Sequence, residues 1–130
     1  MSIDAHIQIE RGTFQLNARL EIPARGVTAV FGPSGSGKTT LLRALAGLEP
    51  CPDSRVIVNG TPWQTTTECL ATHERPVGLV FQEPSLFEHL TVQANLDFGR
   101  QRISKSAQTI PVDHSIELLE ISPFLTRYPH

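Results

Sequence analysis

Residues 26–48 read GVTAVFGPSGSGKTTLLRALAGL, and this stretch decides the fold more than any other part of the chain. It opens with Val27 to Phe31, a continuous apolar and β-branched run that is typical of a strand buried on both faces of an α/β sheet. After a glycine-rich interval, leucines recur at helical spacing, and Gly47 and Pro50 mark the expected end of a helix. The stretch therefore predicts a strand, a loop and a helix in that order.

The glycine-rich interval fits the pattern G-x-x-x-x-G-K-[ST] in the strand-to-helix context that the pattern requires. Its glycines allow backbone N–H groups to point at phosphate oxygens, and the positive end of the helix dipole adds to the attraction. Lys38 would reach the β and γ phosphates, Thr39 would place its hydroxyl on Mg²⁺, and Thr40 would contact the α phosphate. A plain glycine-rich turn with a surface lysine is the alternative, but it does not require Lys-Thr here. The sequence therefore predicts a nucleotide-phosphate site formed by Gly32, Pro33, Ser34, Gly35, Ser36, Gly37, Lys38, Thr39 and Thr40.

The composition of the chain is that of a globular domain. Its 130 residues have the usual size of one domain, and 39% hydrophobic and 18% charged residues argue against disorder. Eleven basic and thirteen acidic residues give a net charge of −2 without a basic run, so the electrostatic footprint of a nucleic-acid binder is missing. The apolar runs fall far short of the roughly 20 residues that span a bilayer. No secretory signal is visible, and we expect a cytosolic location.

The cysteines and histidines form no recognisable metal or disulfide motif. Cys51 and Cys69 lack partners at zinc-ligand spacing, and two thiols are too few for a disulfide framework. The histidines are scattered, without an i, i+4 pair or an adjacent cysteine set: His6, His73, His89, His114 and His130. We therefore expect these side chains to be structural or incidental.

Four further strands are expected around this stretch, besides the one at 27–31. Residues 3–10 and 14–22 alternate apolar and polar side chains, which predicts an antiparallel hairpin that turns at Arg11 and Gly12. Arg55 to Val58 is a short strand before a turn, and the threonine-rich stretch 62–73 is expected to be a surface connection. An apolar run, Val77 to Gln82, predicts a second strand of the α/β sheet.

The last third of the chain is expected to be helical. Thr91 can cap a helix that runs through Gly99. Residues 103–109 are polar and are expected to form a loop. Asp113 can then cap a final helix that bears Ile116, Leu119 and Glu120 and ends before Pro123.

A second segment, residues 75–96, reads RPVGLVFQEPSLFEHLTVQANL and resembles the Q-loop region of ATP-binding cassette (ABC) transporter ATPases. The resemblance extends from about Gly26 to Pro129. It implies that Gln82 contacts Mg²⁺ and the attacking water, so that Lys38 and Gln82 are the catalytic residues and Thr39 and Gln82 the metal ligands. A plain polar strand end is the alternative reading of Gln82. The segment from Glu83 to Leu90 would face a transmembrane permease.

The resemblance also implies a fold and a set of partners. The fold would be an α/β P-loop NTPase, cut short, with an antiparallel hairpin at 1–26, a RecA-like core with the P-loop and Q-loop at 27–87, and the start of a helical subdomain at 88–130. The complete protein would hydrolyse ATP with Mg²⁺ as a head-to-tail dimer with a second ATPase subunit. It would lie peripherally on the cytoplasmic face of a membrane, beside permease subunits that a periplasmic or extracellular binding protein supplies.

Within the family, the hairpin and the two segments are most similar to the ATP-binding subunits of molybdate importers. Importers of sulfate, iron and sugars share much of the pattern, so the assignment of molybdate as substrate rests on analogy. Two departures stand out. In many relatives an aromatic residue stacks on adenine, and by spacing this position falls near Glu10. Phe14 and Trp63 are the aromatic residues nearby, but Phe14 belongs to the apolar set of its strand, which favours core packing. Adenine recognition is therefore unassigned. Glu88 stands where relatives often have proline.

Residues 118–130 resemble the stretch just before the LSGGQ-type signature of the family. The resemblance therefore implies that the signature, the acidic Walker B strand and the switch histidine are not among these 130 residues. We expect the chain alone to bind nucleotide weakly, to hydrolyse it negligibly, and to expose an apolar edge prone to association. Another P-loop enzyme, such as a small kinase, and a non-catalytic nucleotide-binding module are the competing interpretations.

Overall fold

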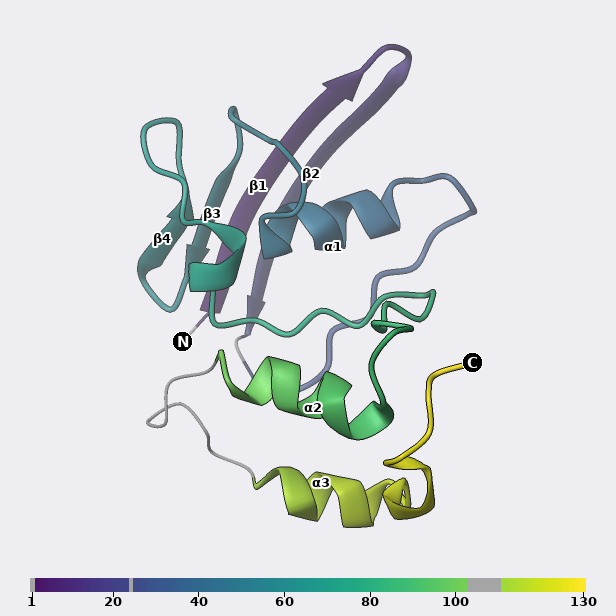
Figure 1. Ribbon diagram of the computed structural model, residues 1–130. Helices are drawn as coiled ribbons and strands as arrows, with labels where there is room; N and C mark the ends of the chain where they lie inside the picture. The colour runs from purple at the N-terminus through teal and green to yellow at the C-terminus, as the bar shows by residue number, and fades with distance from the viewer. Residues whose placement is uncertain (1, 24, 103–110) are drawn as a thin grey trace. The chain divides into compact units, whose positions relative to one another are not determined.

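The computed structural model describes residues 2–23, 25–102 and 111–130, which form two compact units, Met1–Leu79 and Val80–His130 (Figure 1). The first unit contains β1 (Ser2–Arg11), β2 (Phe14–Pro23), α1 (Lys38–Ala46), β3 (Arg55–Val58), β4 (Thr61–Gln64) and η1 (Thr72–Glu74). The second contains α2 (Val92–Arg100), α3 (Val112–Leu118) and η3 (Ser122–Phe124). The division of the chain at residues 26 and 87 stays a prediction.

The first unit is built on a four-stranded antiparallel sheet with the order β2-β1-β3-β4. β1 pairs with β2 along its whole length, from Ser2 opposite Pro23 to Arg11 opposite Phe14. The tight turn between them uses Gly12, whose φ of 57° suits glycine. The predicted hairpin is therefore confirmed, and so is the strand at 55–58.

The stretch 62–73 was expected to be an irregular surface connection, and this was wrong for its beginning. β4 adds to the edge of the sheet, after a turn in which Asn59 and Gly60 both have positive φ values. Trp63 on β4 is buried in the core. Burial of this large ring favours the strand despite polar neighbours, and Pro62 is tolerated because β4 is an edge strand.

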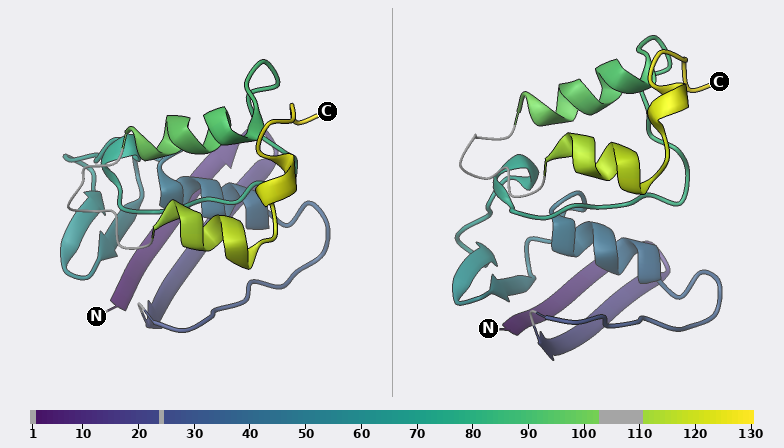
Figure 2. Two further views of the ribbon diagram at one scale, coloured as in Figure 1. Left: turned by 60° about the horizontal axis from the view of Figure 1, so that its bottom comes forward. Right: turned by 90° about the horizontal axis from the view of Figure 1, so that it is seen from below.

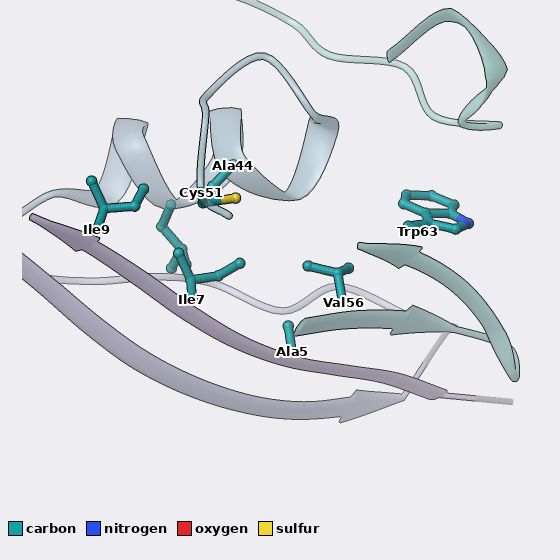
Figure 3. Packing of buried hydrophobic residues seen from close by; sticks show 8 residues of the cluster. Ala5, Ile7, Ile9, Ala44, Cys51, Val56 and Trp63 are labelled. Atoms are coloured by element: carbon teal, nitrogen blue, oxygen red, sulfur yellow. The ribbon is translucent and has the colours of Figure 1, made fainter. Parts of the chain in front are cut away.

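The core of the first unit lies between the sheet and α1 (Figure 1). Figure 3 shows Ile7, Ile9 and Val56 pointing from the strands toward α1. Alternate residues of β1 supply this layer, as the period of two predicted. α1 ends where expected, because Gly47 adopts the left-handed conformation and its N–H donates to the carbonyl of Ala44. The buried cluster comprises Ala5, Ile7, Ile9, Leu41, Ala44, Cys51, Val56 and Trp63.

The two apolar runs that predicted strands of a parallel sheet do not form strands, which corrects the prediction. Residues 27–31 are irregular, and Val27 and Phe31 are 99% and 91% exposed. Residues 77–82 are irregular as well, and Val80 is 96% exposed. An apolar strand of an α/β sheet gains its stability from neighbours on both edges and both faces. The described residues supply no such neighbours, so they form no parallel RecA-like sheet.

In the second unit, α2 and α3 lie side by side in Figure 1 and in the right-hand view of Figure 2. The Thr91 hydroxyl accepts a hydrogen bond from the N–H of Ala94 at 3.2 Å, so the predicted cap of α2 is confirmed. α2 ends at Arg100, one residue beyond the predicted end.

The prediction for the last helix was partly wrong. Pro111 occupies the N-cap position of α3, and Asp113 lies in the first turn, where its carboxylate still complements the helix dipole. The helix stops at Leu118, and Ile116 is its buried residue. Leu119 and Glu120 lie after the end of the helix, and the positive φ of 54° at Glu120 is incompatible with a right-handed helix. The loop predicted at 103–109 lies outside the described residues.

Candidate functional site

The loop from Gly32 to Gly37 leads directly into the N-terminus of α1. It contains a turn in which the N–H of Ser36 donates to the carbonyl of Pro33 at 3.3 Å. Gly35 and Gly37 have φ values of 79° and 94°, a region that favours glycine. The predicted order of loop and helix is therefore confirmed, although the strand before the loop is not formed.

Gly37 is required for a second reason. A Cβ atom at this position would lie 3.1 Å from Cζ of Phe14 and 3.3 Å from Cδ1 of Leu16. The start of β2 therefore supports the loop at the residue before α1, through a contact that only a residue without a side chain permits. Phe14 is half-buried at the end of the inward-facing row of β2, with its ring against this glycine.

The Lys38 ammonium is held by the loop itself. Its Nζ donates to the carbonyl oxygens of Gly32 at 2.8 Å and Pro33 at 2.7 Å, and it lies 3.5 Å from Oγ of Ser36. These are neutral acceptors, and no carboxylate among the described residues forms an ion pair with the lysine. The ammonium therefore places a positive charge beside the loop carbonyls.

The first amides of α1 are open to a ligand. Among the described residues, no hydrogen bond satisfies the backbone N–H groups of Lys38, Thr39 or Thr40. Gly37 supplies no side-chain cap, and the first turn holds no acidic residue. Unpaired amides, the positive end of the helix dipole and an ammonium together form a donor set for a polyanion. These donors fit the phosphates of a nucleotide, and the exposed Thr39 hydroxyl fits the oxygen-rich coordination of Mg²⁺.

Gln82 and the segment 83–90 belong to the second unit, whereas the loop and Lys38 belong to the first. Gln82 lies in an exposed bend rather than at the end of a strand. The roles assigned to these residues, and the meeting of Gln82 with the phosphate site, stay predictions.

Phe14 and Trp63 are the aromatic residues that lie near the position expected to contact adenine, and their surroundings differ. Trp63 is buried in the core, and the guanidinium of Arg75 lies 5.9 Å from the centre of its ring. Phe14 lies against Gly37, at the edge of the phosphate loop. Of these two side chains, only Phe14 adjoins the predicted site.

Arg75 fixes the far end of α1, a role that the sequence alone does not predict. This side chain is 4% exposed, and its Nη1 donates to the carbonyls of Ala44 and Leu45, in the last turn of the helix. Its Nε donates to the carbonyl of Leu70, and Nη2 to that of Trp63. A cation that satisfies carbonyls at a helix C-terminus also complements the dipole. The only signal in the sequence was a lone arginine before Pro76.

Asn95 lies on α2, and the sequence alone predicts no role for it. Its side-chain amide forms hydrogen bonds with the backbone of residues 87–91 in the second unit. Asparagine competes for backbone groups near helix ends, and its position four residues after the capping Thr91 was the available signal.

The described residues contain no cluster of three His, Cys, Asp or Glu side chains that could hold a metal ion. Within the same residues, none of the helices has the length and apolar character needed to cross a membrane. Cys51 is buried and Cys69 exposed, and both are free thiols.

A glycine-rich loop with this sequence, ahead of a helix whose first amides are free, defines the class of P-loop nucleoside triphosphatases. Residues 16–130 match the ABC transporter family, and the chain belongs to this family. The family resemblance inferred from the residues is thus confirmed.

The chain is similar to proteins named "Molybdenum import ATP-binding protein ModC". It is 48% identical to the one from Albidiferax ferrireducens over 126 residues, which are 95% of this chain and 34% of that protein. It is 53% identical to the one from Aromatoleum aromaticum over 116 residues, 88% of this chain and 31% of that protein. For the one from Methylococcus capsulatus the identity is 49% over 127 residues, 98% of this chain and 35% of that protein. The chain thus spans about a third of the length of these relatives.

Proposed function

We propose that this chain binds ATP through residues 32–40, and that the complete protein hydrolyses ATP to drive the import of molybdate. The observation that carries the proposal is the set of open amides at the start of α1, beside the Lys38 ammonium. The names of the similar proteins, which describe molybdenum import, support the choice of substrate. Import of sulfate, iron or a sugar is the alternative, because the loop recognises phosphates and not the transported solute.

Phosphate binding requires the Lys38 ammonium to exchange partners. It leaves the carbonyl oxygens of Gly32 and Pro33 and donates to the β and γ phosphates. The first backbone amides of α1 also donate to the phosphates. Thr39 and Gln82 would hold Mg²⁺, which neutralises phosphate charge when it is bound. The exchange replaces neutral acceptors with charged ones and therefore favours the nucleotide-bound arrangement.

The partners follow from the same proposal. The segment from Glu83 to Leu90 docks on a permease subunit, and a second copy of the ATPase subunit completes the catalytic site. A binding protein outside the membrane delivers the solute to the permease. Leu86 and Phe87, which are 54% and 40% exposed, support a docking role because they present apolar surface. The complete protein then lies on the cytoplasmic face of the membrane, and the 130-residue chain alone binds ATP without sustained turnover.

Titration of the chain with a fluorescent ATP analogue tests the proposal. Lys38→Ala removes one charge-assisted contact and should weaken binding by about 10- to 100-fold. Lys105→Ala, a lysine elsewhere in the chain, is the matched control and should bind like the wild type. Equal affinities for the two variants, or no binding by the wild type, would show that the loop is not a nucleotide site. Sustained hydrolysis by the wild-type chain would contradict the proposed dependence on the complete protein.

The choice of substrate is tested separately in vesicles that contain the complete transporter. Uptake of radiolabelled molybdate should exceed that of sulfate at equal concentration, and both should stop when Lys38 is replaced. Uptake of sulfate alone would overturn the substrate and leave the ATPase proposal intact.

A further inference from the structure

The segment from Glu83 to Leu90 contains little regular structure of its own. Within it, one backbone hydrogen bond, from the N–H of Leu90 to the carbonyl of Phe87 at 3.1 Å, closes a turn. Such a segment would be expected to sample many conformations. Its defined path therefore depends on contacts with α2.

Asn95 on α2 provides these contacts. Its Oδ1 accepts the N–H of Phe87 at 2.8 Å. Its Nδ2 lies 3.1 Å from the carbonyl oxygen of Phe87, 3.2 Å from that of Leu90 and 3.0 Å from that of Thr91. One amide thus holds both backbone groups of Phe87 and the end of the segment. Only a short side chain that carries a donor and an acceptor can do this.

The ring of Phe87 is held as well. It lies 4.4 Å from the ring of Phe98, centre to centre, at an angle of 56°. Phe98 follows Asn95 by three residues, so both side chains occupy the same face of α2. Phe87 is therefore fixed at its backbone by Asn95 and at its ring by Phe98, while Leu86 beside it stays exposed.

We propose that Asn95 is a positioning residue that sets the segment 83–90 in the conformation that docks on the permease. The inference rests on the proposed function, because it concerns the same docking segment. A segment ordered before binding loses less conformational entropy on docking, so the amide raises affinity without touching the partner. Asn95 acts through Leu86 and Phe87, which make the contacts.

The complete ATP-binding subunit and its permease in nanodiscs provide the test. Asn95→Ala should weaken the binding of the subunit to the permease by about 10- to 100-fold, because three contacts with the segment and one with the adjoining Thr91 are lost. Gln93→Ala on the same helix is the matched control, since Gln93 donates to Asp97 within α2 and not to the segment. ATP binding by the isolated subunit should be unchanged in both variants.

Amide hydrogen exchange separates positioning from a general structural role. In Asn95→Ala, the Phe87 N–H should exchange faster while the amides of α2 keep their protection. Asn95→Asp retains an acceptor for this N–H but loses the donors to three carbonyls. It should therefore keep the Phe87 amide protected and still lose affinity for the permease.

The outcomes distinguish this inference from the proposed function. If Leu86→Asp abolishes docking and Asn95→Ala docks like the wild type, the positioning role is overturned and the docking segment stands. If Leu86→Asp also docks like the wild type, the docking segment itself is wrong. Loss of protection throughout α2 in Asn95→Ala would assign the residue a purely structural role and would likewise overturn the inference.

Discussion

The segments that precede α1 and α2 are both irregular, but the two helices differ in whether their first backbone amides are hydrogen-bonded. Before α1, the first amides, those of Lys38, Thr39 and Thr40, find no partner among the described residues. The first amides of α2 are all satisfied, since Val92 and Gln93 donate to the carbonyls of Arg127 and Leu125, and Ala94 donates to Thr91. A helix N-terminus serves as an anion site only when its amides are free. The first segment is thus suited to a ligand, and the second to a rigid surface.

The difference has its origin in the capping residues. Gly37 enters α1 with a left-handed backbone and supplies no side-chain acceptor, so phosphate oxygens can take that place. Thr91 enters α2 with an extended backbone and caps it with its own hydroxyl. Substitutions at these positions should therefore have separable effects on ligand binding and stability.

The largest effect is expected for Gly37→Val. The valine side chain would collide with Phe14. A β-branched residue is also strained at the φ of 94° found here, so the loop cannot keep its path. ATP affinity should fall by more than about 100-fold, measured by titration with a fluorescent analogue. Gly60→Val is the control: its φ is 80°, but nothing lies within 4 Å, so it should lose stability and keep ATP affinity. Equal losses of affinity would show that backbone strain alone explains the effect.

An intermediate effect is expected for Thr91→Ala. Loss of the cap should destabilise the second unit by about 1 kcal/mol and leave ATP affinity unchanged. Urea unfolding can be followed by Tyr128, the sole tyrosine of the chain, and compared with Trp63, its sole tryptophan, in the first unit. Thr66→Ala, in an exposed bend, is the matched control. A shift of the Trp63 transition of the same size would contradict the independence of the two segments.

The smallest effect on stability is expected for Phe31→Ser, just before the phosphate loop. Phe31 is 91% exposed, so its replacement should change the free energy of unfolding by less than about 0.5 kcal/mol. Self-association of the chain, measured by analytical ultracentrifugation, should decrease because an exposed apolar side chain is removed. Leu118→Ser, in the second unit, removes another exposed apolar side chain as a control. A monomeric wild-type chain would refute the expected association.

Local patterns predicted those elements whose stabilising contacts are close in the sequence. The alternation of residues 3–10 and 14–22 predicted the hairpin, because each strand pairs with its neighbour across a short turn. The capping preferences of Thr91 and Gly47 predicted the ends of two helices. The phosphate loop was predicted because its pattern contains both the glycines and the lysine that the geometry uses.

The failures concern elements whose partners are distant in the sequence. Residues 27–31 and 77–82 have the composition of buried strands, but composition cannot supply the neighbouring strands that would bury them. The prediction for the stretch around Trp63 was wrong in the opposite sense. A polar stretch expected to be irregular forms a strand, because the large ring of Trp63 is buried in the core. Arg75 and Asn95 satisfy carbonyls that no sequence pattern marks in advance.

By itself, the sequence determined the hairpin, the phosphate loop with its helix, and the family, since each depends on short-range geometry or on a motif read directly. Only the tertiary structure decided that α1 begins with free amides while α2 begins with satisfied ones, and that Asn95 holds the segment before α2. The physical reason is that hydrogen-bond satisfaction depends on which acceptors the fold brings to a helix end. Arg127 and Leu125 lie more than 30 positions beyond the amides that they satisfy, and no local pattern encodes that meeting.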